Sequence, residues 1–264
     1  MASPRPSRPL HASVPIGTDE VALLGTVLSV WAHPDDETYL AGGLMAALRD
    51  AGQRVVCVTA TRGEAGDPTA DDTGRAELAR LRTTELTAAL RLLGVHEHRW
   101  LDYPDDGCST VDPVEAASRL SQVLEEVEPD TVLTFGPDGF TGHPDHRTVS
   151  AWTDGALAGF AGTPRLLHAV APHGSLELGD QYGVYALGAP RQCRDHELAV
   201  RLALEGACLD RKIAALRCQH SQTAGLIDAM GVQAFATWVG VEAFATPASP
   251  TPAAAAAAGR RAAQ

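Results

Sequence analysis

Residues 26–37 read TVLSVWAHPDDE, an apolar run that ends abruptly in a histidine, a proline and three carboxylates. Residues 131–147 repeat this arrangement as TVLTFGPDGFTGHPDHR, with two histidines after the apolar run. Groups that are costly to bury gather in this way when they converge on a ligand, which is most often a metal ion. The two stretches therefore predict buried strands whose ends lead into one site.

Strand-like and helix-like patterns alternate around these stretches. Further strands are expected at residues 54–59 and 98–101, and apolar helical stripes at 40–48, 86–93 and 120–127. The alternation predicts a single Rossmann-like α/β domain with a mainly parallel sheet and helices on both faces. Ligands bind such sheets beyond the carboxyl ends of the strands, so the active site is expected there. After residue 163 the pattern predicts only a strand at 166–171 and one helical face formed by Leu202, Leu209, Ile213 and Leu216.

The histidines and aspartates of the two stretches have spacings that suit a metal site. His33 and Asp36 are three residues apart, as are His143 and His146, so each pair lies on one face of a helix start. Two imidazoles and one carboxylate hold zinc with a fourth position open to water, whose pKa falls to about 7. Asp35 and Asp36 would point about 100° apart on a helix, so one is expected to bind the metal and the other to act as general base.

These motifs resemble those of the LmbE-like, or PIG-L, superfamily of zinc-dependent N-deacetylases. The resemblance rests on AHPDDE at 32–37 and HPDH at 143–146, with weaker matches in TRGEAG at 61–66, RTTEL at 82–86 and HSQ at 220–222. It extends from residue 27 to residue 244. Members of this superfamily remove acetyl groups from N-acetylglucosamine units of glycolipids, of mycothiol and bacillithiol precursors, and of some antibiotics.

The resemblance implies roles for five residues. His33, Asp36 and His146 would bind one Zn²⁺ per chain, although Fe²⁺ or another divalent metal suits the same ligands. Asp35 would be the general base, and His143 the cation or proton donor that faces the tetrahedral intermediate. Either group could protonate the leaving amine, because both would stand near the attacking water.

Other residues are candidates for supporting contacts. Asp145 would orient the catalytic histidine or its neighbours. Arg62 and Glu64 lie in the 61–66 loop, where the arginine suits a loop cation and a substrate contact equally well. Asp105 suits a turn, although the same loop could bind sugar hydroxyls. Some relatives carry a carbonyl-polarising tyrosine where this chain has Thr141, so that task would fall to zinc and the catalytic histidine, or to another loop residue.

The two ends of the chain differ in composition from its middle. Residues 1–20 are rich in proline, serine and arginine and predict a flexible leader, whereas the alanine- and proline-rich residues 246–264 predict a disordered tail. The deacetylase-like domain is expected over residues 21–245. No apolar run reaches the 18 or so residues of a membrane span. Five cysteines without a C-x-x-C pair predict reduced thiols and a cytoplasmic location.

Charge and motifs together predict a function. The net charge of −12 disfavours nucleic acid and anionic membranes as partners and favours a small neutral or cationic substrate. We predict a zinc-dependent hydrolase of linear amides that removes an N-acetyl, or related N-acyl, group from an amino-sugar-containing small molecule. The sequence leaves the oligomeric state open, a homo-oligomer included.

The sequence leaves one alternative enzyme open and disfavours two other classes of protein. The alternative enzyme is an amidase of mycothiol-like thiol conjugates, which would use the same zinc chemistry on a larger amide. The presence of Asp35 disfavours a non-catalytic metal- or sugar-binding protein. A dinucleotide-binding module is disfavoured because no G-x-G-x-x-G follows the first strand.

Overall fold

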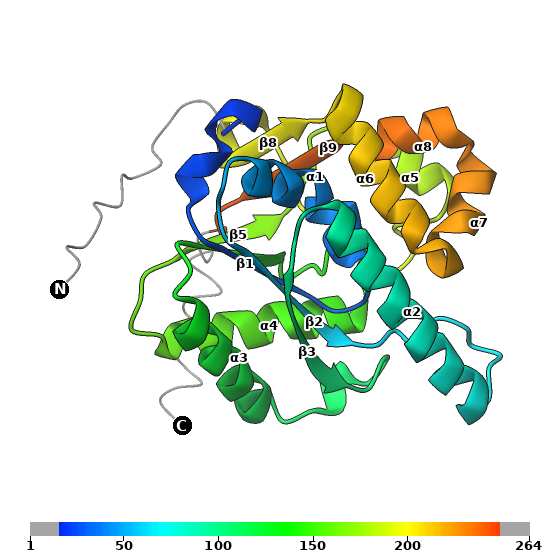
Figure 1. Cartoon of the computed structure of the whole chain (residues 1–264), viewed down its shortest axis with the longest axis horizontal. Helices are drawn as coiled ribbons and strands as arrows, with labels where there is room; N and C mark the ends of the chain where they lie inside the picture. Colours follow the sequence, from blue (N-terminus) through cyan, green and yellow to red (C-terminus); the bar gives the residue numbers. More distant parts are fainter. Residues whose placement is uncertain (1–15, 249–264) are drawn as a thin grey trace.

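The computed structural model describes residues 16–248, in which a seven-stranded sheet has the order β3–β2–β1–β4–β5–β9–β8 (Figure 1). The neighbours among β1 to β5 pair in parallel, whereas β9 pairs antiparallel with both β5 and β8. The strands of this sheet are β1 (Val27–Trp31), β2 (Val55–Thr61), β3 (Glu97–Tyr103), β4 (Thr131–Phe135), β5 (Arg165–Ala169), β8 (Val200–Ala203) and β9 (Val241–Ala245). A second, two-stranded sheet pairs β6 (Ala171–Pro172) with β7 (Gln192–Cys193).

Helices cover both faces of the main sheet. The α3 and α4 helices pack together on one face, and α1, α2 and α6 pack together on the other (Figure 1). The shorter helices α5, α7 and α8 gather at one end of the molecule. The α-helices are α1 (Asp36–Asp50), α2 (Asp72–Leu92), α3 (Pro113–Val127), α4 (Pro144–Gly159), α5 (Glu177–Gln181), α6 (Gly206–Cys218), α7 (His220–Met230) and α8 (Val232–Val239). Short 3₁₀ helices are η1 (Thr18–Leu24), η2 (Cys108–Thr110) and η3 (Asp195–Glu197).

The order of the strands creates a crevice at the carboxyl end of β1. From β1 the chain builds outward through β2 and β3 on one side, and then returns to add β4 and β5 on the other. Neighbouring crossovers diverge at such a topological switch point, which is where open α/β sheets bind ligands. The segments after β1 and β4 are the two histidine-rich stretches, so the predicted α/β fold is confirmed and its crevice has the predicted position.

The central strands are apolar because both of their faces are buried. Every residue of β1, β2 and β4 is buried, which explains why these segments are almost continuously apolar instead of alternating. Their few hydroxyl groups have partners within the protein: Thr134 Oγ1 donates to the Val30 carbonyl at 2.9 Å, and Thr131 Oγ1 donates to the Leu24 carbonyl at 2.8 Å. Core packing thus fixes the strand ends from which the site is built.

The expectations for the late part of the chain were partly wrong. Leu202 does not share a helical face with Leu209, because it lies in β8 and pairs with Glu242, while α6 begins only at Gly206. The apparent helical period ran across a strand–helix boundary. The antiparallel β8–β9 pair and the helices α7 and α8 had not been predicted.

The predicted leader also begins to fold earlier than expected. Residues 16–20 belong to the domain, because Ile16 is buried and bridges to Val200, and η1 begins at Thr18. The rest of the expected leader, and the tail beyond residue 248, lie outside the described residues. Over residues 16–248, no helix is both long and apolar enough to span a membrane.

Candidate active site

The first half of the site is the turn between β1 and α1. Asp35 precedes α1 with φ 110° and ψ −31°, a conformation that residues other than glycine rarely adopt. Glu37 Oε2 accepts the Asp35 N–H at 3.0 Å, and Arg82 donates to the Pro34 carbonyl at 2.5 Å. Arg82 Nη2 also lies 3.3 Å from Asp35 Oδ2. Such strain persists where surrounding contacts enforce it, and it is frequent at functional sites.

The second half is the start of α4. His143 is the N-cap residue, and its Nδ1 accepts the Asp145 N–H at 3.2 Å. Three residues on, His146 stacks on Phe135 with ring centroids 4.1 Å apart, so the last residue of β4 orients this imidazole. The predicted i, i+3 pair therefore begins at the helix N-cap, and its two rings lie side by side with centroids 5.0 Å apart.

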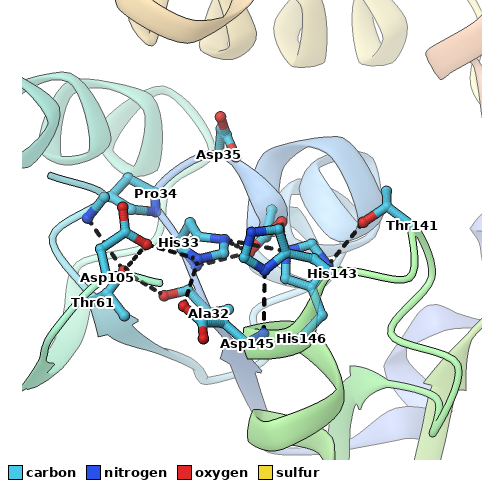
Figure 2. A network of polar contacts seen from close by, with 12 residues as sticks. Ala32, His33, Pro34, Asp35, Thr61, Asp105, Thr141, His143, Asp145 and His146 are labelled. Atoms are coloured by element: carbon cyan, nitrogen blue, oxygen red, sulfur yellow. Dashed lines mark hydrogen bonds and ion pairs between the residues drawn. The ribbon is translucent and has the colours of Figure 1, made fainter. Parts of the chain in front are cut away.

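The two halves bring three potential ligands together (Figure 2). His33 Nδ1 lies 3.1 Å from His146 Nε2. The Asp36 carboxylate lies 3.5 Å from that His33 nitrogen and 3.3 Å from the His146 nitrogen. All three side chains are buried.

Contacts on the far side of each ring decide which nitrogen carries a proton. His146 Nδ1 lies 2.9 Å from the Gly139 carbonyl, which can only accept, so this nitrogen donates. His33 Nε2 lies 3.0 Å from Asp105 and 3.4 Å from Asp145, whose carboxylates also accept. In the neutral imidazoles the nitrogens that face each other are therefore lone pairs, which is the orientation that metal-binding histidines have.

Electrostatics within the cluster follow from burial and the paired charges. Burial lowers the pKa of His146 to about 4. Burial opposes the ionisation of Asp36, but His146 and His33 outweigh it and hold the Asp36 pKa at about 2. Burial would also lower the pKa of His33, yet hydrogen bonds with the surrounding carboxylates raise it well above its ordinary value. The cluster thus presents a carboxylate and a neutral imidazole at neutral pH.

The donor set fits a metal ion. Zinc bonds of about 2.0–2.1 Å in a tetrahedron place ligand atoms about 3.4 Å apart, close to the 3.1–3.5 Å spacings among His33, Asp36 and His146. Ring nitrogens of His33, His143 and His146 also lie within 4.8 Å of one another, as do ligand atoms of His33 with Asp105 and Asp145. The site therefore contains a histidine–aspartate cluster that could hold a metal.

Asp35 and His143 flank this cluster. Burial raises the pKa of Asp35 to about 7, although the charge of Arg82 opposes the rise. Figure 2 shows the Asp35 carboxyl pointing away from the histidines. The His143 ring packs edge-on against His33 with centroids 4.8 Å apart, and its Nε2 lies 3.3 Å from Asp106.

The other predicted residues are distributed unevenly around the site. The Asp145 carboxylate contacts His33 and the Cys108 N–H instead of the His143 ring, to which only its backbone N–H donates. Asp105 is more central than a turn residue would be, because it binds His33 and accepts the Ala65 N–H at 2.8 Å. Thr141 lines the cavity, with its hydroxyl 3.3 Å from His146 Nδ1.

The two candidates from the 61–66 loop do not line the cavity. Arg62 donates to Asp102 at 2.7 Å and lies over the Trp100 ring at 4.1 Å, so it is a structural cation of the loop. Glu64 accepts the Asp105 N–H at 3.0 Å and thereby supports the loop that carries that aspartate.

Sequence reasoning missed the importance of Arg82, which it included only in the weak RTTEL match at residues 82–86. Its side chain is only 6% exposed, and it donates to the carbonyls of Gly63 and Pro34. A signal was available: Arg82 stands four and seven residues before Leu86 and Ala89, on the buried stripe of α2. An arginine on such a stripe needs buried partners, and the turn at Asp35 supplies them.

The cluster opens into a cavity of about 590 Å³. Its lining includes charged side chains from the loop after β3 and from α2, and apolar side chains from the later helices. A cavity of this size suits a small organic molecule.

Comparison with known proteins identifies the family. Residues 28–157 match the family described as PIG-L: GlcNAc-PI de-N-acetylase. A 1D-myo-inositol 2-acetamido-2-deoxy-alpha-D-glucopyranoside deacetylase from Corynebacterium diphtheriae is 32% identical over 224 residues, which cover 74% of this chain and 75% of the relative. The protein belongs to the PIG-L family, as its motifs had indicated.

Other relatives match over a shorter part of their length. A deacetylase of the same name from Kineococcus radiotolerans is 37% identical over 164 residues, which cover 52% of this chain and 45% of the relative. A second, from Catenulispora acidiphila, is 39% identical, and 58% of its length is covered. The chain thus spans about half the length of these two curated relatives.

Solved structures share the fold. The N,N′-diacetylchitobiose deacetylase from Pyrococcus horikoshii superposes with a TM-score of 0.58 at 24% identity, covering 84% of this chain and 82% of that one. GalB, the 4-carboxy-2-hydroxymuconate hydratase from Pseudomonas putida, superposes with a TM-score of 0.56 at 20% identity, covering 85% and 97%. Because a deacetylase and a hydratase share this architecture, the fold alone does not define the reaction.

Proposed function

We propose that the protein is a zinc-dependent N-deacylase that hydrolyses the N-acetyl, or a related N-acyl, amide of an amino-sugar-containing small molecule. The observation that carries the proposal is the convergence of the His33, Asp36 and His146 side chains at the switch point of the sheet. The relatives named as deacetylases of an inositol-linked 2-acetamido sugar support the substrate class.

In this mechanism His33, Asp36 and His146 would hold the metal, and Asp35 is the base. Zinc bound there would polarise the amide carbonyl and acidify the attacking water. Asp35 accepts the proton of that water, and a carboxyl whose pKa is about 7 suits a base that works near neutral pH. Arg82 keeps the Pro34–Asp35 turn in its strained form, and the Asp35 carboxyl lies among the groups that line the cavity.

His143 is the proposed partner of the developing oxyanion. Its ring lies beside the ligand His33, and Asp106 lies within ion-pair distance of its Nε2. One such donor contributes on the order of 10²–10³-fold to acyl-transfer rates. As the C–N bond breaks, the acyl carbon leaves as a carboxylate, and the amine takes a proton from Asp35 or His143.

Amine release from purified protein tests this function. The substrates are N-acetylglucosamine, its inositol-linked pseudodisaccharide and an N-acetylated thiol conjugate, each measured with added zinc and with chelator. We expect zinc-dependent release from an acetylated sugar, abolished in Asp35→Asn and kept in Asp228→Asn, the same change at an exposed carboxyl of α7. Release from the thiol conjugate alone would favour the amidase, and no release from any substrate would refute the proposal.

A further inference from the structure

The lining of the cavity has two chemically different parts. Arg82 and Gln222 lie together beside Gly66, whereas Leu178, Leu226 and Trp238 pack against one hydrophobic cluster. One part carries charged and amide groups, from Arg82, Asp105, Asp106 and Gln222. The other carries apolar side chains, from Phe140, Leu178, Val184, Tyr185, Leu226 and Trp238. Figure 2 shows Asp105 and Thr141, which stands next to Phe140, on opposite sides of the histidines. We call these parts the polar arm and the apolar arm.

Most of the apolar arm is built by the late part of the chain. Leu178 comes from α5, Leu226 from α7 and Trp238 from α8, all of which lie after the family match ends at residue 157. The three side chains are half-buried: they pack against a hydrophobic cluster and also line the cavity. Exposed apolar surface gathered in a cavity marks a place where an apolar group binds.

The charged residue that borders this arm does not make it polar. Glu242 lies among the lining residues, but its carboxylate is fully buried and pairs with Lys212 Nζ at 2.7 Å. It also accepts the N–H groups of Gly43 and Leu44, each at 2.7 Å. Its oxygens therefore already have protein partners, and hydroxyl groups of a sugar would gain little there.

The shape of an amide decides which part of the substrate enters which arm. A secondary amide is planar and trans, so its acyl substituent and its nitrogen substituent project in opposite directions. With the carbonyl at the cluster, the sugar hydroxyls on the nitrogen side match the carboxylates and amide of the polar arm. The acyl substituent then extends into the apolar arm, which a single methyl group would leave largely empty.

We propose that the apolar arm binds the acyl chain and that the preferred substrate is an amino sugar with an N-acyl chain longer than acetyl. This inference rests on the proposed N-deacylase function. In the reaction, water adds its oxygen to the carbonyl carbon, the C–N bond breaks, and a fatty carboxylate and a free amino sugar leave. The chain-length preference arises because each methylene leaves water for an apolar wall.

The test compares glucosamines with N-acyl chains of two, four, six and eight carbons on the zinc-loaded full chain, with amine release as the readout. We expect kcat/KM to rise about fourfold per added methylene, reaching on the order of 10²-fold from N-acetyl to N-hexanoyl. Leu178→Gln and Leu226→Gln should each lower the ratio of kcat/KM for the hexanoyl substrate to kcat/KM for the acetyl substrate about tenfold. Leu187→Gln is the matched control, because this side chain is 64% exposed and outside the cavity.

Two further measurements distinguish an acyl chain from other occupants of the apolar arm: a variant with a bulky side chain in the arm, and substrates with an alkyl chain on the sugar instead of on the amide. Val184→Trp fills the apolar arm, so the ratio of kcat/KM for the hexanoyl substrate to that for the acetyl substrate should fall to about one or below. A rate that is flat or falls with acyl length would overturn the inference while leaving the proposed function intact. A rate that rises instead for octyl N-acetylglucosaminide would assign the apolar arm to the aglycone and also overturn it. Failure to hydrolyse any N-acyl sugar would refute the proposed function itself.

Discussion

Replacing Lys212 with methionine is expected to lower the free energy of unfolding by about 3–5 kcal/mol, the cost of leaving a buried charge without its partner. Lys212 and Glu242 are fully buried, and their charged atoms lie 2.7 Å apart. Lys212 Nζ also donates to the Tyr39 carbonyl at 2.7 Å, while Glu242 accepts from the Gly43 and Leu44 N–H groups. The pair therefore attaches β9 and α6 to the middle of α1, the helix that begins at the candidate ligand Asp36.

The size of the effect follows from burial. Methionine fills much of the volume of the lysine, so the loss is electrostatic: the Glu242 carboxylate keeps two N–H partners but loses its counter-ion. The matched control is Arg211→Met, the same kind of change one residue earlier on α6. Arg211 pairs with Asp50 at 2.6 Å, but both side chains are partly exposed, so its loss should cost less than about 1 kcal/mol.

Denaturant unfolding followed by tryptophan fluorescence measures both variants, since Trp31 and Trp152 are buried in the core. A loss of about 4 kcal/mol is a large part of the 5–15 kcal/mol that is typical of a domain, so the midpoint should shift clearly. If Lys212→Met proved no less stable than Arg211→Met, the view that this ion pair is desolvated and anchors α1 would be wrong.

Four further predictions concern the site. His146→Ala should lose the bound divalent metal, and metal analysis showing equal content in wild type and variant would remove His146 from the ligand set. Asp35→Asn should keep the metal but lower turnover by about 10²-fold or more, and a near-normal rate would remove Asp35 from the base role. His143→Ala should lower kcat more than it raises KM, because the charge it faces develops mainly in the transition state; a change in KM alone would make it a binding residue. Arg82→Met should free the Pro34–Asp35 turn and lower kcat while Arg62→Met, the control on the neighbouring loop cation, does not; equal losses in steady-state assays would contradict the positioning role of Arg82.

Much of the fold could be predicted because its central elements have local patterns. The strands β1, β2 and β4 are buried on both faces, so they appear in the sequence as short apolar runs. The helices that follow carry apolar stripes with the helical period, and α3 also has a proline near its start. Alternating strands and helices of this kind favour parallel crossovers, so a site beyond the carboxyl ends of the strands could be predicted. The strand order that places the switch point at β1 came only from the structure.

The structure of the later part of the chain could not be predicted, because it depends on contacts with residues far away in the sequence. Whether residues near Leu202 form a strand was decided by pairing with β9, some forty residues further on. The short helices α5, α7 and α8 are shaped by packing around a shared cavity, so none has a long periodic pattern of its own. For this reason the apolar arm could not be recognised before the structure was known.

The candidate site was also predicted in part from the sequence and decided in part by the tertiary structure. The sequence alone determined which residues could hold a metal, because His33, Asp36, His143 and His146 are local motifs at strand ends. Only the tertiary structure decided how they are arranged. Asp105 contacts His33 Nε2, and the Gly139 carbonyl accepts a hydrogen bond from His146 Nδ1. Arg82 donates to the Pro34 carbonyl and so holds the turn before α1. These contacts join residues that are between 7 and 72 positions apart, and they arise from the packing of whole elements, which no local pattern encodes.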